Sequence, residues 1–381
     1  MHETTGGRDP RLDVLRGLAL VMIYINHVPG TLWEAFTSRN YGFSDAAEGF
    51  VMMAGVAAGL AYSSGFLRGD AVPTARRIWR RGWTLYMVHI LLTVIAVAVA
   101  AAFYKLGAPQ LSNENLTHVI FDDPMGFMLG VALLTHQLGY ANILPMYAAL
   151  LFLAPAFLVL AVHRPKLLLA GSILLWAFAG QTRFNLPNYP MPGGWFFNPF
   201  AWQLLFVIGL LTGVAMKQGR RLVPATPALV WLSGSVLVIV LIWAKFEPVA
   251  DVLNAGRLAL AKLGFPYWVT EFEKSIVSVL RLVHFLALAY FLSALPIVRR
   301  ICARPELAPL AVMGRNGLPV FALGTALCYA AQGVMDMRPN TPVLEATLIW
   351  GGVALQWLFA VLRDRWRFSK ARTPVGVPAT P

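Results

Sequence analysis

Charged residues are scarce in this sequence: Asp, Glu, Lys and Arg make up 13% of its 381 residues, while 58% are hydrophobic. An ordinary soluble domain is about 25% charged and about 45–50% apolar, so this composition excludes a soluble globular protein. Only two cysteines occur, which excludes a disulfide scaffold and a Cys-x-x-Cys metal site. The sequence also lacks the His-x-x-x-His spacing and the carboxylate cluster of a metal site, so no metal is expected.

What the sequence has instead is apolar runs of about 20 residues, the length that crosses a bilayer as a helix. We predict an all-α polytopic membrane protein with one integral-membrane domain over residues 1–362 and a basic, proline-containing cytoplasmic tail over 363–381. About ten spans are expected, at Leu12–Val28, Ala46–Ser63, Gly82–Tyr104, Tyr140–Val162, Leu167–Gly180, Pro199–Met216, Thr226–Ala244, Ser275–Val298, Leu307–Val334 and Pro342–Leu362.

The formal net charge is +13, which in a soluble protein would suggest a nucleic-acid partner. Short cytoplasmic loops of membrane proteins carry the excess of Lys and Arg. With the N-terminus inside, 20 of the 31 basic residues fall in inner segments and eight in outer segments. Both termini are therefore predicted to be cytoplasmic, and the charge requires no nucleic acid.

Three arginines lie within the apolar spans: Arg16, Arg281 and Arg315. Ionisable groups inside a membrane are costly and mark a candidate site. Arg281 has His284 three residues later, and Arg315 is followed by Asn316 in a Gly-Arg-Asn-Gly break. Arg281 and Arg315 each have two interpretations: contact with a phosphate or an acyl carboxylate of a donor, or an internal network with an acidic residue, Asp13 or Glu48.

The first span places Arg16 and His27 eleven residues apart, on one helix face and about 16 Å apart along the axis. Asp13, three residues before Arg16, is placed to pair with it. A cation near the cytoplasmic end and an imidazole near the outer end suit a long anionic donor that reacts at its far end. The alternatives are an ion pair that fixes the helix at the headgroups and an interfacial histidine with ordinary hydrogen bonds.

Asp45 and Glu48 stand at the outer end of the second span, level with His27. We predict that one of them orients the imidazole and stabilises its protonated form. The competing interpretation is ordinary capping of the helix N-terminus by Ser44 and Asp45. The spacing of Gly55 and Gly59 in the same span predicts close helix packing.

These stretches closely resemble the OpgC-type osmoregulated periplasmic glucan succinyltransferases, which belong to the wider acyltransferase-3 group of membrane acyltransferases. The resemblance rests on Arg8–Leu20, Asn26–Gly30 and Arg39–Glu48, with later support from Phe197–Leu204 and Met313–Val320. In the wider group an Arg-x10-His pair is functional, and it falls here on Arg16 and His27. A Ser-Gly pattern of the group is only partly kept, because Met53-Ala54-Gly55 has alanine in place of serine.

The resemblance implies an enzyme of the bacterial inner membrane that moves an acyl group, expected to be succinyl, from cytoplasmic acyl-CoA to a hydroxyl of a periplasmic glucan. Acyl-CoA is then a substrate, and no permanently bound cofactor is expected. The implied partners are acyl-CoA, the glucan and the lipid bilayer, with no oligomeric state indicated.

We hypothesise that Arg16 meets the phosphates of the donor and that His27 acts as general base, or as a nucleophile through an acyl-histidine. Arg315 or Asn316 is expected to stabilise the oxyanion, and Arg281 to bind the carboxylate of a succinyl group. The contrasting class is a transporter of a small anion or glycan precursor, which would also place arginine and histidine within spans.

Overall fold

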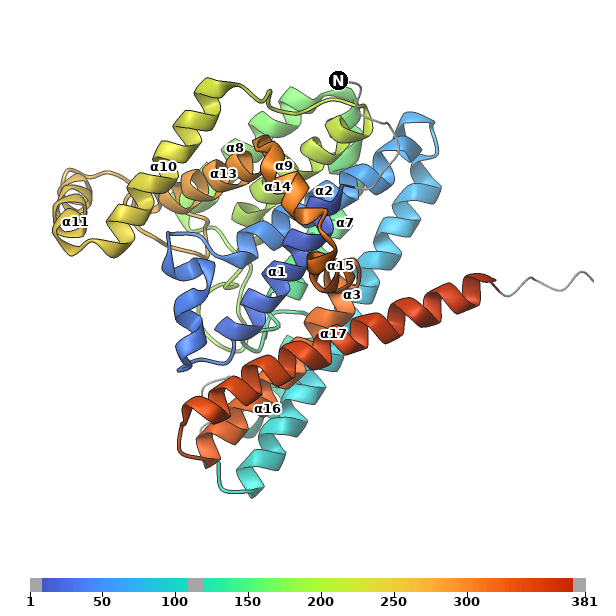
Figure 1. The fold of residues 1–381 in the computed structure, drawn as a ribbon, viewed down its shortest axis with the longest axis vertical. Coiled ribbons are helices and arrows are strands. Elements are labelled where there is room, and N and C mark those ends of the chain that lie inside the picture. The colour runs from blue at the N-terminus through green and yellow to red at the C-terminus, as the bar shows by residue number, and fades with distance from the viewer. Residues whose placement is uncertain (1–8, 109–118, 373–381) are drawn as a thin grey trace, which may run out of the picture.

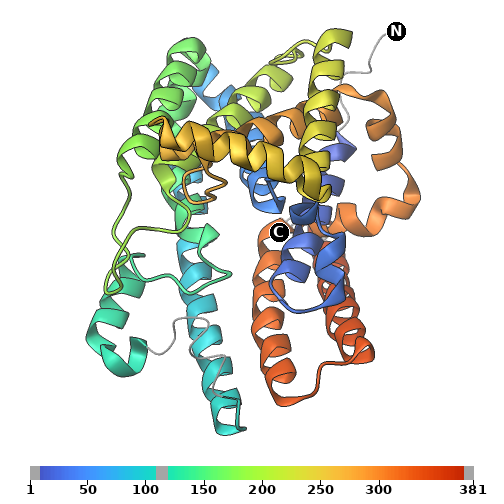
Figure 2. The same cartoon turned by 90° about the vertical axis from the view of Figure 1, so that its left-hand side faces the viewer.

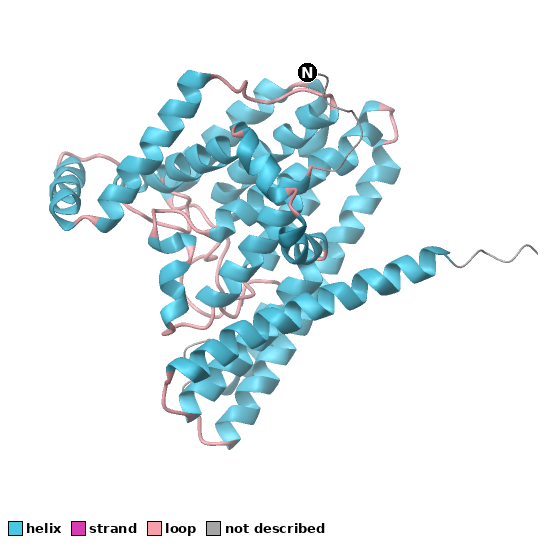
Figure 3. Ribbon diagram, in the orientation of Figure 1, coloured by secondary structure: helices cyan, strands magenta, loops and turns pink. Residues whose placement is uncertain are grey.

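The computed structural model describes residues 9–108 and 119–372, and in these residues the chain forms helices and no extended strand (Figure 3). The predicted all-α class is therefore confirmed. The helices are α1 (Pro10–Asn26), α2 (Ala46–Leu67), α3 (Ala71–Lys105), α5 (Val119–Asp122), α6 (Pro124–Ala132), α7 (Ile143–His163), α8 (Pro165–Thr182), α9 (Pro199–Lys217), α10 (Pro227–Lys245), α11 (Glu247–Lys262), α12 (Tyr267–Thr270), α13 (Val279–Ala294), α14 (Pro296–Cys302), α15 (Ala308–Arg315), α16 (Gly317–Met337) and α17 (Pro342–Arg372), with short 3-10 turns η1 (Leu32–Phe36), η2 (Ser38–Asn40) and η3 (Pro305–Leu307).

Seven helices in the described residues are long and apolar enough to cross a membrane: α2, α3, α7, α9, α10, α16 and α17. The pair α13 and α14 gives an eighth if its two parts, bent by 77°, form one broken span. A polytopic membrane protein is confirmed, but the expected number of about ten is too high by this measure. The first predicted span forms α1, which has only 17 residues, among them Arg11, Asp13 and Arg16.

Two predicted spans are interrupted rather than continuous. Leu295 has an extended backbone because Pro296 follows it, and this ends α13 before α14 begins. The predicted span Leu307–Val334 is divided at Asn316 into α15 and α16. At the C-terminus, α17 continues through Arg372, past the predicted boundary at 362, and residues 373–381 of the predicted tail lie outside the described residues.

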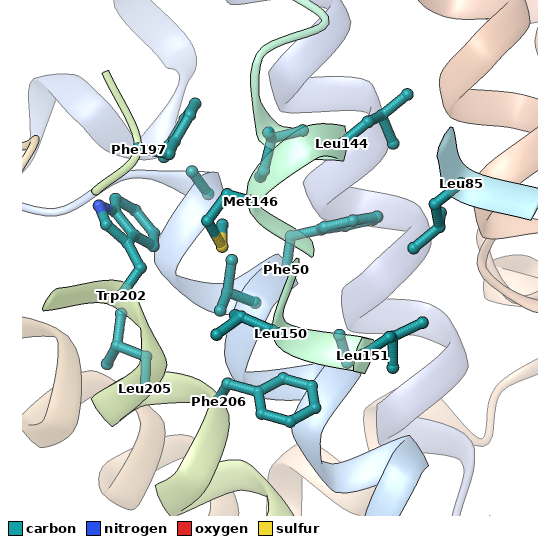
Figure 4. Packing of buried hydrophobic residues seen from close by; sticks show 14 of the residues in the cluster. Phe50, Leu85, Leu144, Met146, Leu150, Leu151, Phe197, Trp202, Leu205 and Phe206 are labelled. Atoms are coloured by element: carbon teal, nitrogen blue, oxygen red, sulfur yellow. The ribbon is translucent and has the colours of Figure 1, made fainter. Parts of the chain in front are cut away.

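The core lies where α2, α7 and α9 meet, with Phe50, Leu150 and Phe206 buried among them (Figure 4). Helices α2 and α9 pack backbone to backbone: a Cβ on Gly55 would lie 2.1 Å from the Phe206 carbonyl oxygen, and one on Gly209 would lie 2.1 Å from that of Met52. The predicted close packing at Gly55 is therefore confirmed.

Helix α1 crosses this core and contacts α2, α15 and α16 (Figure 1). The C-terminus of α1 and the N-terminus of α2 are joined by residues 27–45, which include η1 and η2, and His27 and Asp45 lie toward the same end of the bundle. We call this the outer end, because the distribution of basic residues predicts that it faces away from the cytoplasm. The opposite end of α1, near Asp13, is the inner end.

Candidate functional site

His27 is held at the outer end of α1 by its own backbone. Its N–H bonds to the carbonyls of Ile23 and Tyr24, which closes the last helical turn, and Pro29 follows two residues later and prevents the helix from continuing. The His27 carbonyl accepts a 2.6 Å hydrogen bond from the Gln332 amide of α16. These contacts use only main-chain atoms of His27, so they leave its side chain available for chemistry.

His27 is one of the residues that line a small pocket of about 10 Å³, which is room for about one water molecule. Its Nδ1 atom is buried and has no hydrogen-bond partner among the described residues. A ring nitrogen of this kind is suited to take up a proton from a group bound nearby. The other residues that line the pocket come from α1, α16 and α17, and they are Leu20, Ile23, Tyr24, Phe321, Gly324, Thr325, Cys328 and Gln356.

The pocket borders the outer part of the α1 stripe that runs from Arg16 to His27, and Arg16 itself does not line it. Positions 16, 20, 23 and 27 recur at the spacing of one helix face, and Leu20 and Ile23 line the pocket between the two polar residues. Because α1 is unbroken from Pro10 to Asn26, the predicted separation of about 16 Å along the axis applies to the folded chain.

Arg16 lies half-buried at the inner part of this stripe. Its Nη2 atom donates a 3.2 Å hydrogen bond to the Met53 carbonyl of α2. A Cβ on Gly317, the first residue of α16, would approach its Cδ atom to 3.1 Å, so the glycine leaves room for the arginine stem. Asp13 is buried one turn below, and its pairing with Arg16 stays a prediction.

Tyr140 was not singled out from the sequence, yet its ring contacts His27. The two ring centroids are 4.4 Å apart and the planes are tilted by 43°. Tyr140 has a φ of 70°, a left-handed conformation that is strained for a tyrosine and that surrounding contacts must maintain. One such contact is made by the Tyr329 hydroxyl, which donates to the carbonyl of Gly139. No local sequence signal indicates this arrangement, because it depends on the path of the loop before α7.

Arg315 and Asn316 lie at the inner end, far from His27. Arg315 forms a 3.1 Å ion pair with Asp364 of α17, and the Asn316 amide donates to the same carboxylate at 2.7 Å. The adjacent Gly314 packs so closely on α1 that a Cβ there would lie 1.9 Å from the Asp13 carbonyl oxygen. The expected oxyanion role at His27 is therefore corrected: these residues join α15 to α17, an internal network with a partner that the sequence did not suggest.

A second group of polar side chains lies at the outer end, and we call Ser44, Asp45, Glu48, Lys274, Arg281 and His284 the outer polar cluster. Glu48 is fully buried and accepts hydrogen bonds from Arg281 at 2.9 Å and 2.5 Å. Lys274 pairs with Asp45 at 2.6 Å, and the second guanidinium nitrogen of Arg281 reaches the same carboxylate at 3.4 Å. The sequence did not predict Lys274, which comes from a distant loop.

The two carboxylates of this cluster also cap α2. Asp45 accepts from the Ala47 N–H at 2.9 Å, while Glu48 accepts from the Asp45 N–H, which completes a capping box. Burial alone would raise the pKa of the Asp45 carboxyl, but the Lys274 ammonium and the Arg281 guanidinium hold it at about 2. The capping interpretation is confirmed, and the expected orientation of His27 by Asp45 or Glu48 has no direct contact to support it among the described residues.

Arg281 is likewise engaged by protein groups. Arg281 is 8% exposed and its side chain hydrogen-bonds to Glu48 and Asp45, so the internal-network interpretation with Glu48 is confirmed. The expected contact with a succinyl carboxylate would require Arg281 to leave a buried partner, which is strongly unfavourable. We therefore do not retain that role.

His284 supports the loop in front of α2. Its Nδ1 accepts a 3.2 Å hydrogen bond from the Ser44 N–H and lies 2.8 Å from the Ser44 hydroxyl, so we assign the ring proton to Nε2. A Cβ on Gly42 would lie 2.3 Å from the imidazole, which shows how tightly the loop wraps around it. The predicted neighbours Arg281 and His284 thus lie in one cluster. Arg281 binds the carboxylates of Asp45 and Glu48, and His284 binds Ser44, so both hold the start of α2.

The described residues contain no group of three or more His, Cys, Asp and Glu side chains that could hold a metal ion. No curated protein and no solved structure matches the sequence. A family model described as "OpgC protein" matches residues 8–368, which is nearly the whole chain and includes both α1 and the outer polar cluster. The chain therefore belongs to the OpgC family.

Proposed function

We propose that the protein is an O-acyltransferase of the bacterial inner membrane that moves an acyl group, succinyl in our proposal, from cytoplasmic acyl-CoA to a hydroxyl of a periplasmic glucan. Membership of the OpgC family supports the class of reaction. The observation that carries the proposal is the stripe on α1, where Arg16 and His27 lie at the two ends of a face that also lines a pocket. A donor that enters from one compartment and reacts near the other requires such a path.

In the proposed reaction the phosphates of acyl-CoA lie near Arg16 and the basic inner loops, and the pantetheine arm extends along α1 toward His27. The apolar side chains of Leu20, Ile23 and Phe321 line the pocket, and they would have to move apart to admit this arm. His27 accepts the proton of a glucan hydroxyl as the hydroxyl oxygen attacks the thioester carbon. The carbon–sulfur bond then breaks, and the thiolate of CoA takes the proton from the imidazolium.

The tetrahedral intermediate requires a hydrogen-bond donor near its oxyanion. With Arg315 and Asn316 at the inner end, we assign this role to Gln356, whose amide lines the same pocket as His27. One N–H of this amide is bonded to the Gly352 carbonyl at 3.2 Å, which fixes the side chain and leaves the other N–H for the ligand. A route through an acyl-histidine would use the same residues, with His27 as the nucleophile.

The proposal is tested by the release of CoA. Protein reconstituted in liposomes is incubated with succinyl-CoA and a periplasmic glucan, and free thiol and glucan mass are measured together. We expect one free thiol for each acyl group found on the glucan, and little thiol release when the glucan is omitted. A transporter would move a solute without producing thiol, so transport without thiol release contradicts the proposal. Acetyl-CoA in a parallel reaction determines the acyl preference.

Tyr140 is expected to hold the His27 ring in its reactive orientation. An aromatic contact of this kind is worth about 0.5–1.5 kcal/mol, so Tyr140→Ala should lower the rate of acyl transfer by about 2- to 10-fold. The matched control is Tyr104→Ala, because Tyr104 is 61% exposed on α3 and does not line the pocket. Initial rates of thiol release measure both variants, and equal rates for Tyr140→Ala and the parent protein would contradict a positioning role.

A further inference from the structure

Helix α11 lies against the side of the bundle and contributes no buried residue to it. It follows α10 directly but does not continue its direction: Figure 1 shows α11 end-on at the left of the molecule, and Figure 2 shows it lengthwise across the front. The chain leaves α10 at Lys245, the end of that helix remote from the predicted cytoplasmic loop before Pro227. α11 therefore lies at the outer end and crosswise to a membrane-spanning helix.

The two sides of α11 differ in chemistry. Val252, Gly256, Ala259, Leu260 and Leu263 recur at i, i+4, i+7, i+8 and i+11, which places them on one face. This apolar face is turned away from the protein, since Val252 is 70% exposed and Leu263 77% exposed.

The side of α11 that faces the protein is mixed, with Leu253 partly buried beside Asn254 and Arg257. Asn254 accepts a 3.3 Å hydrogen bond from the Trp243 indole N–H of α10. Arg257 donates to the Thr270 carbonyl at 2.9 Å and forms a 2.6 Å ion pair with Glu271. An amphipathic helix in a soluble protein buries its apolar face, whereas α11 leaves Val252 and Leu263 exposed. The charged residues Asp251 and Lys262 are exposed on a different side of the helix.

We propose that α11 is an in-plane membrane anchor whose apolar face is immersed in the outer leaflet of the bilayer. Amphipathic helices of this length lie in the interface with the apolar side chains below the headgroups. The apolar surface of α11 is continuous in the chain with that of the membrane-spanning α10, where Trp231 and Ile239 are exposed, and Phe246 at the junction is 56% exposed. The surface that contacts lipid on α10 thus extends onto α11.

A second copy of the chain is a less suitable occupant of this face. A stable protein interface buries about 800 Å² on each partner. One stripe of five side chains, two of them glycine and alanine, offers much less area than this. The small residues Gly256 and Ala259 leave the face without the large aromatic anchors that dominate protein interfaces.

The anchor fixes a loop that reaches the outer polar cluster. Arg257 holds the segment at Thr270 and Glu271, and three residues further on Lys274 pairs with Asp45 at the start of α2. Immersion of α11 therefore sets the height of this outer loop relative to the bilayer. This inference concerns only the position of α11 and does not depend on the proposed acyl transfer.

Spin labels on α11 in the full-length protein, reconstituted in phosphatidylethanolamine–phosphatidylglycerol liposomes, test the proposal. Single cysteines at 252, 258, 260 and 263 are introduced after replacement of Cys302 and Cys328, both of which are free and buried. Leu258 is the matched control for Leu260, because both are exposed leucines on the same helix but on different faces. Accessibility to oxygen and to a water-soluble nickel complex gives the depth of each label.

We expect labels at 252, 260 and 263 to lie about 5–10 Å below the lipid phosphates and the label at 258 to be accessible to nickel. In a second arm, Leu260→Asp should move the label at 252 into water, whereas Leu258→Asp should leave its depth unchanged. Equal nickel accessibility at 258 and 260 would overturn the proposal. Dipolar broadening between labels on different copies at 252 would also overturn it and assign the face to self-association.

Discussion

Replacement of His27 by alanine is expected to abolish acyl transfer from acyl-CoA to the glucan. General acid–base catalysis contributes about 10²- to 10⁴-fold to a rate, and His27 is the one imidazole among the described pocket-lining residues. The fold should survive, because the structural hydrogen bonds of residue 27 come from its backbone: the N–H closes α1 and the carbonyl accepts from Gln332. The measurement is the rate of thiol release from protein shown to be correctly inserted.

The control for this variant is His163→Ala, since His163 is an exposed histidine at the far end of α7. We expect His163→Ala to retain the parent rate. A His27→Ala protein that inserts normally and keeps more than about a tenth of the parent rate would contradict both the general-base and the acyl-histidine versions. Trapping of a labelled acyl-enzyme in the parent without acceptor would distinguish the two versions, because only the acyl-histidine route forms one.

Local spacing explains why the relative positions of Arg16 and His27 on α1 were predictable from the sequence. An unbroken helix fixes the relation between positions 16 and 27 whatever surrounds it, and the structure keeps α1 regular over this stretch. The same reasoning predicted the close approach of α2 through Gly55, because small residues at a four-residue spacing form a flat helix face.

Contacts between distant segments were not predictable in the same way. The sequence suggested Asp13 or Glu48 as partners of the intramembrane arginines, and Glu48 does pair with Arg281. Arg315, however, pairs with Asp364, which is 49 residues away on α17. Tyr140 reaches His27 only through a loop with a left-handed residue, and Lys274 reaches Asp45 across 229 residues. Such pairs depend on the assembled bundle, which periodicity does not encode.

The predicted number of spans exceeds eight because α1 and α8 are not among the described helices that are long and apolar enough to cross a membrane. Two other predicted spans contain internal breaks. Pro296 removes a backbone N–H and forces an extended residue before it, so the eighth predicted span bends instead of crossing straight. The Gly-Arg-Asn-Gly sequence around Arg315 similarly separates α15 from α16. The residues that cause both breaks can be read in the sequence, but the 77° bend between α13 and α14 is seen only in the structure.

The second large effect is expected at the outer polar cluster, where Arg281→Ala should destabilise the protein by about 3–5 kcal/mol. The reason is Glu48, which is fully buried and would lose its counter-charge. Asp45 is affected less, because Lys274 still pairs with it at 2.6 Å. The control is Arg68→Ala, which removes an exposed ion pair with Asp70 and should cost at most about 1 kcal/mol. Denaturation of the detergent-solubilised protein measures both variants.

The double variant Arg281→Met with Glu48→Leu separates a structural role from substrate binding. Replacing both members of a buried ion pair by apolar residues often changes the free energy of unfolding little. This variant should therefore regain most of the stability that Arg281→Ala loses. If Arg281 only balances Glu48, acyl transfer to the glucan returns together with the folded protein. A double variant that folds normally but transfers no succinyl group would instead place Arg281 at the substrate, and an Arg281→Ala protein as stable as Arg68→Ala would contradict the buried pair itself.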